Sequence, residues 1–242
     1  MAAYIIIAII AYLIGSINFS VIISKRMAGF DVREKGSGNA GTTNMLRSIG
    51  VKAAVITLLC DILKGVVVIL IAILIGNIVD GLDDALLVQL AGIFVIIGHT
   101  FPIFFGFKGG KGIATSLGVL LMINWQIGLI CLVFALILMA ITRMVSVGSI
   151  AAAILFPVLV VFIGQNYIVP VNNWSYLIFS IIIAILVLFN HRENLKRIFT
   201  GKENKISFKK VRLLFHDKRY NLVRKASGND DSGLSFCSDS RR

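Results

Sequence analysis

Long apolar runs constrain this chain more than any other sequence feature, because runs of this length indicate membrane spans. Hydrophobic residues make up 57% of the 242 residues and charged residues only 15%, and the mean hydropathy is +0.91. This composition excludes a water-soluble globular domain. We therefore expect an all-α integral membrane protein.

Seven apolar segments follow one another along the sequence. A segment of about 16 or more residues can cross the ~30 Å hydrocarbon core at ~1.5 Å per residue. The two shorter segments, 113–124 and 127–141, must borrow flanking residues, thin the membrane or form a re-entrant region. We predict seven transmembrane helices, with short re-entrant or interfacial elements in the inner loops, from the segments 4–23, 53–76, 85–105, 113–124, 127–141, 145–164 and 175–190.

The loops predict the orientation of these spans. The first segment lacks the charged leader and small-residue cleavage site of a signal peptide, so we expect a retained helix. Lysine and arginine collect on the cytoplasmic side, and the alternate loops of this chain carry neither residue. We predict an outer N-terminus and a cytoplasmic C-terminus from the basic inner-loop residues Lys25, Arg26, Arg33, Lys35, Arg47, Lys52, Lys108, Lys111 and Arg143.

The net charge of +12 follows the same rule, because most basic residues lie in the inner loops and the tail. No nucleic-acid recognition module accompanies the charge, so we expect no nucleic-acid partner. Cys60, Cys131 and Cys237 have neither metal-binding spacing nor a disulfide framework. We expect no metal site and no cofactor.

Residues 206–242 differ in composition from the rest of the chain. Their first half alternates apolar and basic residues and can lie as an interfacial helix on an anionic membrane surface, whereas the Ser-, Gly- and Asp-rich end is typical of disorder. We predict a membrane-embedded domain at 1–205 and a basic, partly disordered cytoplasmic tail at 206–242 without a catalytic role.

Three clusters of polar and glycine residues fall on the same predicted inner face. Polar groups at the edge of a bilayer cost free energy unless they are satisfied, so three clusters at one depth indicate a shared polar site. The clusters are KGSGNAGTTNMLR at 35–47, GHTFPIFFGFKGGKG at 98–112 and NHRENLKRIFTGKENK at 190–205.

In the first cluster, Gly36 and Gly38 flank Ser37, which lets backbone N–H groups approach a ligand without side-chain obstruction. Asn39 can cap a short helix that begins near Gly41. On that helix, Arg47 would share a face with residues 43 and 44. This combination favours an anion site, most naturally for phosphate. The alternative is a glycine-rich turn followed by an inside-positive arginine.

In the second cluster, GFKGGKG lacks the GxxxxGK[ST] spacing of a P-loop and follows no strand pattern, so it does not predict nucleotide triphosphate hydrolysis. Its glycines still allow a tight curve lined with N–H donors, to which Lys108 and Lys111 add charge. We expect Pro102 to disturb the helix that holds His99 and to place a kink just before the loop. The alternative is an ordinary turn between two spans.

In the third cluster, Asn190, His191, Asn194 and Arg197 are spaced to lie along one side of a helix that leaves the membrane. We expect this side to face the shared polar site. His191 is a candidate general base or phosphate ligand, or an interfacial histidine with neither role.

Asp61 and Lys64 lie one helical turn apart inside the second span. Counted from Lys52, they are ~13 to 18 Å along the helix axis, a depth at which a lone charge is costly. We expect the two side chains to neutralise each other or to reach a polar cavity.

The three clusters, in this order and between spans, resemble the signature motifs of the bacterial acyl-phosphate:glycerol-3-phosphate acyltransferase family, from about residue 4 to 205. The resemblance implies a seven-span enzyme of the bacterial inner membrane with its active site towards the cytoplasm. It also implies transfer of a fatty acyl group from acyl phosphate to the 1-hydroxyl of glycerol 3-phosphate. The products would be lysophosphatidic acid and inorganic phosphate, at the start of phospholipid synthesis.

The sequence departs from the family pattern in GSINFS, where Asn18 replaces the usual proline, so a bend in the first span stays open. Ser146 and Glu203 enter the site through the resemblance alone. We predict catalytic roles for Ser37, Arg47, Lys108, Ser146 and His191, and substrate binding by Gly36, Gly38, Asn39, Thr43, Asn44, Gly109, Gly110, Lys111, Gly112, Asn190, Asn194 and Glu203.

Both implied substrates carry phosphate and one carries an alkyl chain, which agrees with two phosphate-binding loops beside membrane lipid. Acyl phosphate has a good leaving group, so direct attack by the glycerol hydroxyl needs no covalent intermediate. We expect N–H groups of residues 109–112 to hold the departing phosphate. We expect the substrate's own phosphate to take the proton of the glycerol hydroxyl, with His191 as a positioning or phosphate-contacting residue. The alternative is that His191 is the general base.

A transporter of organic phosphates is the main alternative function, because inward-facing basic glycine loops and an intramembrane Asp and Lys pair also suit one. The chain shows no repeated halves with corresponding broken helices. A non-enzymatic scaffold would explain the hydrophobicity but not three polar clusters on one face.

Overall fold

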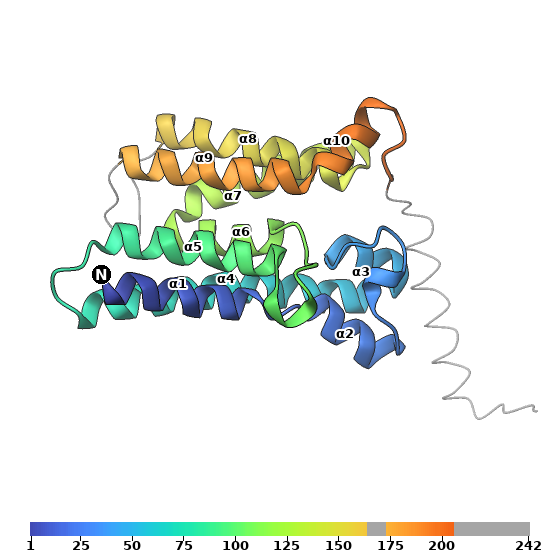
Figure 1. Cartoon of the computed structure of the whole chain (residues 1–242). Coiled ribbons are helices and arrows are strands. Elements are labelled where there is room, and N and C mark those ends of the chain that lie inside the picture. The colour runs from blue at the N-terminus through green and yellow to red at the C-terminus, as the bar shows by residue number, and fades with distance from the viewer. Residues whose placement is uncertain (164–172, 206–242) are drawn as a thin grey trace, which may run out of the picture. The chain divides into compact units, whose positions relative to one another are not determined.

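A computed structural model describes residues 1–163 and 173–205, which are largely helical and, within these ranges, contain no β-strand (Figure 1). The predictions for the tail at 206–242 lie outside these described residues. Helices α1 (Ala2–Gly15) and α2 (Phe19–Ala28) together form the first apolar segment.

The first span is interrupted between α1 and α2, although Asn18 stands where the resemblance leads us to expect a proline. The backbone of Asn18 is extended, and its side chain accepts a hydrogen bond from Val21 N at 3.2 Å. An asparagine N-cap satisfies one of the N–H groups that every helix start leaves unpaired. Asn18 therefore provides the interruption by capping α2.

The other helices follow the predicted apolar segments closely. Helix α5 ends at Thr100, just before Pro102 and the loop, as expected of a helix that this proline disturbs. The disturbance is a helix end rather than a kink in a continuous helix, because Pro102 precedes the short turn η2. The remaining elements are η1 (Val32–Glu34), α3 (Thr42–Ser48), α4 (Val51–Ile78), α5 (Asp84–Thr100), η2 (Ile103–Phe105), α6 (Ile113–Ile123), α7 (Trp125–Thr142), α8 (Val145–Ile163), α9 (Asn173–Asn190) and α10 (Arg192–Phe199).

Five helical segments in the described part are long and apolar enough to cross a membrane, or six if the bent pair α9 and α10 forms one span. Helix α7 reaches 18 residues because it borrows flanking residues, and Asn124 caps it by accepting from Ile127 N at 3.0 Å. Helix α6 has only 11 residues, fewer than a span needs. The all-helical membrane fold is confirmed, and the seventh crossing and the orientation stay predictions.

Glycine residues allow the spans to pack closely. Helix α1 packs on α5 at Gly15 and Gly98, and α4 packs on α6 at Gly65 and Gly118. A Cβ atom at any of these four positions would collide with the backbone of the facing helix. Small residues let helices approach in lipid, where close packing drives association. These contacts hold α5 and α6, the two helices that flank the second polar cluster.

Candidate active site

All three polar clusters lie at the end of the helices where Figure 1 shows α3 and α10. The second and third clusters touch, since Lys111 Nζ donates a hydrogen bond to Asn194 Oδ1 and Asn190 Nδ2 donates to Lys111 O at 3.4 Å. The first cluster reaches the third through Arg47, whose Nη2 lies 3.5 Å from Asn204 O. The structure thus brings the three clusters together.

Asn44 organises the turn of the first cluster. Its Nδ2 lies within 3.0 Å of the carbonyl oxygens of Val32, Lys35 and Asn39, and its Oδ1 accepts from Ser37 N at 2.9 Å. The side chain is buried. The polar atoms of Asn44 are therefore occupied by the protein, and this residue shapes the turn.

The glycines that flank Ser37 serve the same turn. Gly36 and Gly38 have φ of +62° and +71°, a region that glycine adopts at little cost. The N–H groups of Ser37 and Gly38 donate within the turn, whereas we predicted that they face a ligand. Asn39 does not cap α3 either, because that helix starts after Gly41 without a side-chain cap.

The glycine loop of the second cluster is fastened to the end of α5. Gly109 N donates to Thr100 O at 3.0 Å, and Gly110 N donates to His99 O at 3.1 Å. A Cβ atom at Gly109 would collide with both carbonyl oxygens, and one at Gly110 would collide with the His99 ring and with Ala40 O. These two glycines permit close packing, and their N–H groups are not free to hold phosphate as predicted.

The donors that stay free lie at the start of α6. Within the described ranges, the N–H groups of Lys111 and Gly112 have no hydrogen-bond partner, and the first turn of a helix leaves further N–H groups unpaired. The buried hydroxyl groups of Thr115 and Ser116 are also unpaired there. Free donors at a helix N-terminus are the arrangement that binds phosphate.

The third cluster bends by 62° at His191, so α9 and α10 are not the single straight helix that the spacing predicted. Asn190 Nδ2 donates to Thr100 Oγ1 at 3.2 Å. His191 is buried, and its Nδ1 lies 2.8 Å from Val187 O. Because a carbonyl oxygen can only accept, Nδ1 carries the proton and Nε2 of the neutral ring is left as an acceptor.

Glu203 connects the third cluster to α8. Its Oε1 accepts from Ser146 Oγ at 2.8 Å and from Asn194 Nδ2 at 2.7 Å, and its Oε2 accepts from Arg197 Nε at 2.9 Å. Burial opposes the charge, but the hydrogen bonds from Asn194, Ser146 and Arg197 hold the pKa of Glu203 below its ordinary value. Ser146, predicted to be catalytic, uses its hydroxyl group to donate a hydrogen bond to this carboxylate.

Lys111 lies half-buried beside this carboxylate and donates to Asn194 Oδ1. Burial, together with repulsion from Arg197 and Arg47, lowers the pKa of Lys111 to about 8, although attraction to Glu203 opposes the shift. A poorly hydrated ammonium with cationic neighbours gains from a bound anion. Lys111 is therefore well placed to bind phosphate.

Four other predicted site residues lie at the same end with at least part of their side chains exposed. Ser37, Lys108 and Arg47 are exposed, and Thr43 is half-buried. In the described part of the chain, the side chains of Ser37, Thr43 and Lys108 form no hydrogen bond or ion pair. These side chains are free to turn towards a ligand.

Arg33 clamps the glycine loop, although its sequence position marks it only as an inside-positive arginine. Its Nη1 donates to Phe105 O at 2.6 Å and to Lys108 O at 3.0 Å, and its Nη2 pairs with Asp31 Oδ2 at 2.8 Å. The guanidinium thus ties the first inner loop to the second. The acidic residue two positions earlier is the one sequence signal for this role.

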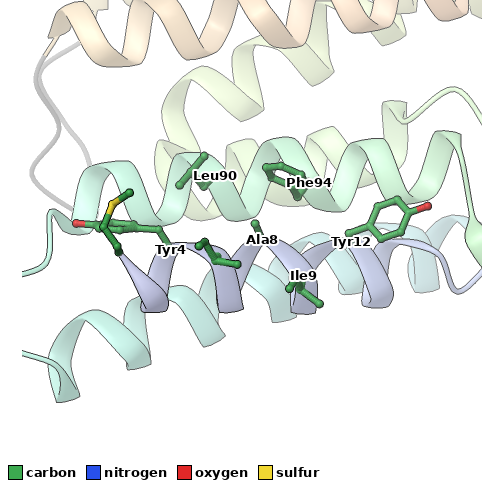
Figure 2. A pocket seen from close by; sticks show the side chains of 8 residues that line it. Tyr4, Ala8, Ile9, Tyr12, Leu90 and Phe94 are labelled. Carbon is green, nitrogen blue, oxygen red and sulfur yellow. The ribbon is translucent and has the colours of Figure 1, made fainter.

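No group of three or more His, Cys, Asp or Glu residues in the described ranges is placed to bind a metal ion. An apolar depression of about 470 Å³ lies between α1 and α5, where Tyr4, Tyr12, Leu90 and Phe94 are among its lining residues (Figure 2). Its lining contains none of the residues of the three clusters, so it is separate from the polar site.

The described helices include segments that can span a bilayer, as in an integral membrane protein, and at one end they carry a cationic, donor-rich site of the kind that suits anionic ligands. The sequence profile of the glycerol-3-phosphate acyltransferase family matches residues 5–201. The chain belongs to this family, which confirms the resemblance found in the sequence. The matched range includes every predicted site residue except Glu203.

Relatives from several bacteria cover most of the chain. The glycerol-3-phosphate acyltransferase of Clostridioides difficile (strain 630) is 44% identical over 208 residues, which are 86% of this chain and 98% of the relative. That of Thermoanaerobacter sp. (strain X514) is 44% identical over 202 residues, which are 84% and 95% of the two chains. This chain is therefore similar to whole relatives rather than to fragments of them.

Solved structures of PlsY (YgiH), an integral membrane glycerol 3-phosphate acyltransferase, share the fold. Its glycerol 3-phosphate form matches with a TM-score of 0.75 at 36% identity, over 86% of this chain and 98% of that chain. Its lysophosphatidic acid form matches with a TM-score of 0.73 at 34% identity, over 87% and 98%. The similarity supports a helical membrane fold like that of PlsY.

Proposed function

We propose that this protein transfers a fatty acyl group from acyl phosphate to the 1-hydroxyl of glycerol 3-phosphate and releases lysophosphatidic acid and inorganic phosphate. Family membership supports the acyltransferase class and the acceptor. The two forms in which PlsY was solved, with glycerol 3-phosphate and with lysophosphatidic acid, agree with this acceptor and this product.

One observation supports acyl phosphate as the acyl donor. The free N–H groups at the start of α6 lie beside Lys111, which is held by Asn194 next to the Glu203 carboxylate. This place suits a phosphate group, and the exposed side chains of Ser37 and Arg47 can serve a second one. Acyl phosphate and glycerol 3-phosphate supply two phosphate groups close to the reacting atoms. A thioester supplies none at its carbonyl group.

In the proposed reaction, the 1-hydroxyl oxygen of glycerol 3-phosphate forms a bond to the acyl carbonyl carbon. The bond between that carbon and the phosphate oxygen breaks, and the phosphate leaves with the electron pair. The N–H groups of Lys111 and Gly112 hold the departing phosphate, while the Lys111 ammonium balances its charge. Phosphate is a good leaving group, so no covalent enzyme intermediate is required.

The hydroxyl proton goes to the phosphate of the substrate, whose second pKa of ~6 suits neutral pH. His191 acts as a positioning residue in this scheme. Its Nδ1 donates to Val187 O, which fixes the orientation of the ring. Nε2 on the other side of the ring can then accept a hydrogen bond from a substrate hydroxyl. Ser146 supports Glu203, and Lys108 and Arg47 bind phosphate oxygens.

The protein would lie in the bacterial inner membrane with this site towards the cytoplasm. Basic residues concentrate at the end that carries the site, as the positive-inside rule requires of a cytoplasmic face. Seven crossings result if α6 and the bent pair α9 and α10 each count as one. An odd number of crossings places the two termini on opposite sides of the membrane. With the basic loops on the cytoplasmic side, the N-terminus would be outside and the C-terminus cytoplasmic.

The test is phosphate release by the purified protein in lipid, given palmitoyl phosphate with and without glycerol 3-phosphate, beside palmitoyl-CoA. We expect release that requires glycerol 3-phosphate, forms lysophosphatidic acid and fails with the thioester. Transfer from palmitoyl-CoA alone would overturn the donor and keep the acyltransferase class. Uptake of glycerol phosphate into vesicles without any product would favour a transporter.

A further inference from the structure

Three ionisable side chains meet inside the spans, where the glycine loop joins α5. Asp61 and Lys64 come from α4 and His99 comes from α5, and their exposed fractions are 2%, 4% and 4%. Lys64 Nζ lies 2.8 Å from Asp61 Oδ1 and 2.7 Å from His99 Nδ1. The ion pair expected from the sequence is therefore present, and it has a third member.

Lys64 also reaches the interruption of the first span. Its Nζ lies 3.2 Å from Gly15 O and 3.1 Å from Ile17 O. A helix end leaves carbonyl groups without an intrahelical partner, and in lipid such groups must be satisfied by the protein. One ammonium therefore joins α4, α5 and the carbonyl groups between α1 and α2.

His99 links Lys64 to the glycine loop, because it contacts both. His99 Nδ1 lies 2.7 Å from Lys64 Nζ and 3.4 Å from Asp61 Oδ1. A charged Lys64 ammonium can only donate, and beside it Nδ1 accepts while Nε2 carries the proton of the neutral ring. The Nε2 edge packs against Gly110, where a Cβ atom would collide with it, and His99 O accepts from Gly110 N at 3.1 Å. The ring and the carbonyl of one residue thus both hold the loop.

We propose that Asp61, Lys64 and His99 are positioning residues that set the place of the glycine loop, and with it Lys111 and the start of α6, for the phosphate of the acyl donor. The inference rests on the function proposed above. Three apolar side chains would fill the same space without the cost of burying charges, so stability alone does not explain this network. The network is better explained by its geometry, because it fixes three helix ends relative to one another.

Two variants of His99 distinguish the role of Nδ1 from that of Nε2. In His99→Asn, the side-chain oxygen can replace Nδ1 and accept from Lys64, whereas in His99→Gln the amide reaches only the position of Nε2. We expect His99→Asn to raise the KM for palmitoyl phosphate only slightly, because it keeps the contact with Lys64 and the hydrogen bond from Gly110 N to the residue-99 carbonyl and loses only the packing of the Nε2 edge. We expect His99→Gln to raise it roughly tenfold to a hundredfold, with the KM for glycerol 3-phosphate unchanged.

A double variant guards against misfolding. Asp61→Asn with Lys64→Met removes both charges together, so no lone charge is left in the membrane. We expect it to fold and to raise the same KM. Gln89→Met is the matched control, because Gln89 is a buried polar residue on α5 whose Nε2 donates to Ser175 Oγ at 3.0 Å. It should lower the thermal midpoint without changing either KM.

Hydrogen exchange of the Gly109 and Gly110 amides gives a readout that does not depend on the donor. We expect roughly tenfold faster exchange in His99→Gln and in the double variant than in the wild type or Gln89→Met. Unchanged exchange, equal KM values for His99→Asn and His99→Gln, or loss of kcat at an unchanged KM would each overturn the network. A wild type that makes no product from palmitoyl phosphate would instead overturn the proposed function.

Discussion

The Ser146 hydroxyl at the start of α8 donates a 2.8 Å hydrogen bond to the Glu203 carboxylate beyond α10, across 57 positions of sequence. Asn194 and Arg197 donate to the same carboxylate. Glu203 therefore fixes the end of the chain's last described helix against another span. Its charge also faces Lys111.

Glu203→Gln keeps the size of this side chain and removes its charge. Hydrogen bonds to charged groups are stronger than those to neutral ones, so we expect kcat/KM to fall about tenfold or more. Glu193→Gln is the control, because the pair of Glu193 with Lys196 on α10 is exposed, and its loss should change kcat/KM little. Equal losses in the two variants would contradict a special role for Glu203.

Lys111 should make phosphate binding pH-dependent. Its pKa is about 8 in the folded protein, below the ordinary lysine value of 10.5, so the ammonium loses its proton as pH rises through about 8. We expect the KM for palmitoyl phosphate to rise above this pH. The unfolded chain binds more protons between about pH 8 and 10.5, so this group's contribution to stability grows over that window.

Two lysine variants check this assignment. Lys111→Arg keeps its charge at high pH, so its KM should stay flat where that of the wild type rises. Lys52→Met is the control for net charge, because Lys52 is an exposed lysine at the start of α4. A rise with pH that persists unchanged in Lys111→Arg would assign the titration to another group.

Arg33 should act through the loop that it clamps. Arg33→Gln loses the ion pair with Asp31 and the contacts to the carbonyls of Phe105 and Lys108. We expect the KM for palmitoyl phosphate to rise about fivefold to tenfold. Arg33→Lys should not restore it, because an ammonium lacks the fork that holds carboxylate and carbonyls together. Exposed Arg26→Gln serves as the control, and an equal effect there would contradict the clamp.

His191→Ala separates positioning from proton transfer. Because Nδ1 is held by Val187 O, the proposed positioning role depends on Nε2. We expect a higher KM for glycerol 3-phosphate with kcat largely retained at saturation. His191→Gln, whose amide reaches the place of Nε2, should recover part of the loss. Lost turnover at an unchanged KM would make His191 the general base.

Asn18 should contribute to stability through its cap. Asn18→Ala removes the hydrogen bond to Val21 N and should cost about 1 kcal/mol, seen as a lower thermal midpoint in detergent. Asn18→Ser keeps a capping oxygen and should stay close to the wild type. An Asn18→Ala protein as stable as Asn18→Ser would show that the interruption of the first span is held by other contacts, such as those of Lys64.

Sequence patterns were sufficient for the membrane class, most of the spans and the gathering of three polar clusters at one end. These properties follow from apolar runs and from the side on which lysine and arginine collect, and both can be read locally. The same patterns led us to predict more glycines in ligand binding than the structure supports. GSG and GG indicate a backbone that approaches something closely, but Gly110 meets the His99 ring and Gly36 meets Asn44.

Only the tertiary structure determines which hydrogen-bond donors lack a protein partner and which charged side chains contact one another. Ser146 and Glu203, Lys64 and the Gly15 carbonyl, and Arg33 and the Lys108 carbonyl come from distant segments, and their contacts depend on where helices end. A helix end is set by hydrogen bonds that compete with the apolar pattern, as Asn18 shows by interrupting a continuous apolar run. Helix packing then brings these ends together, and no local spacing encodes that distance.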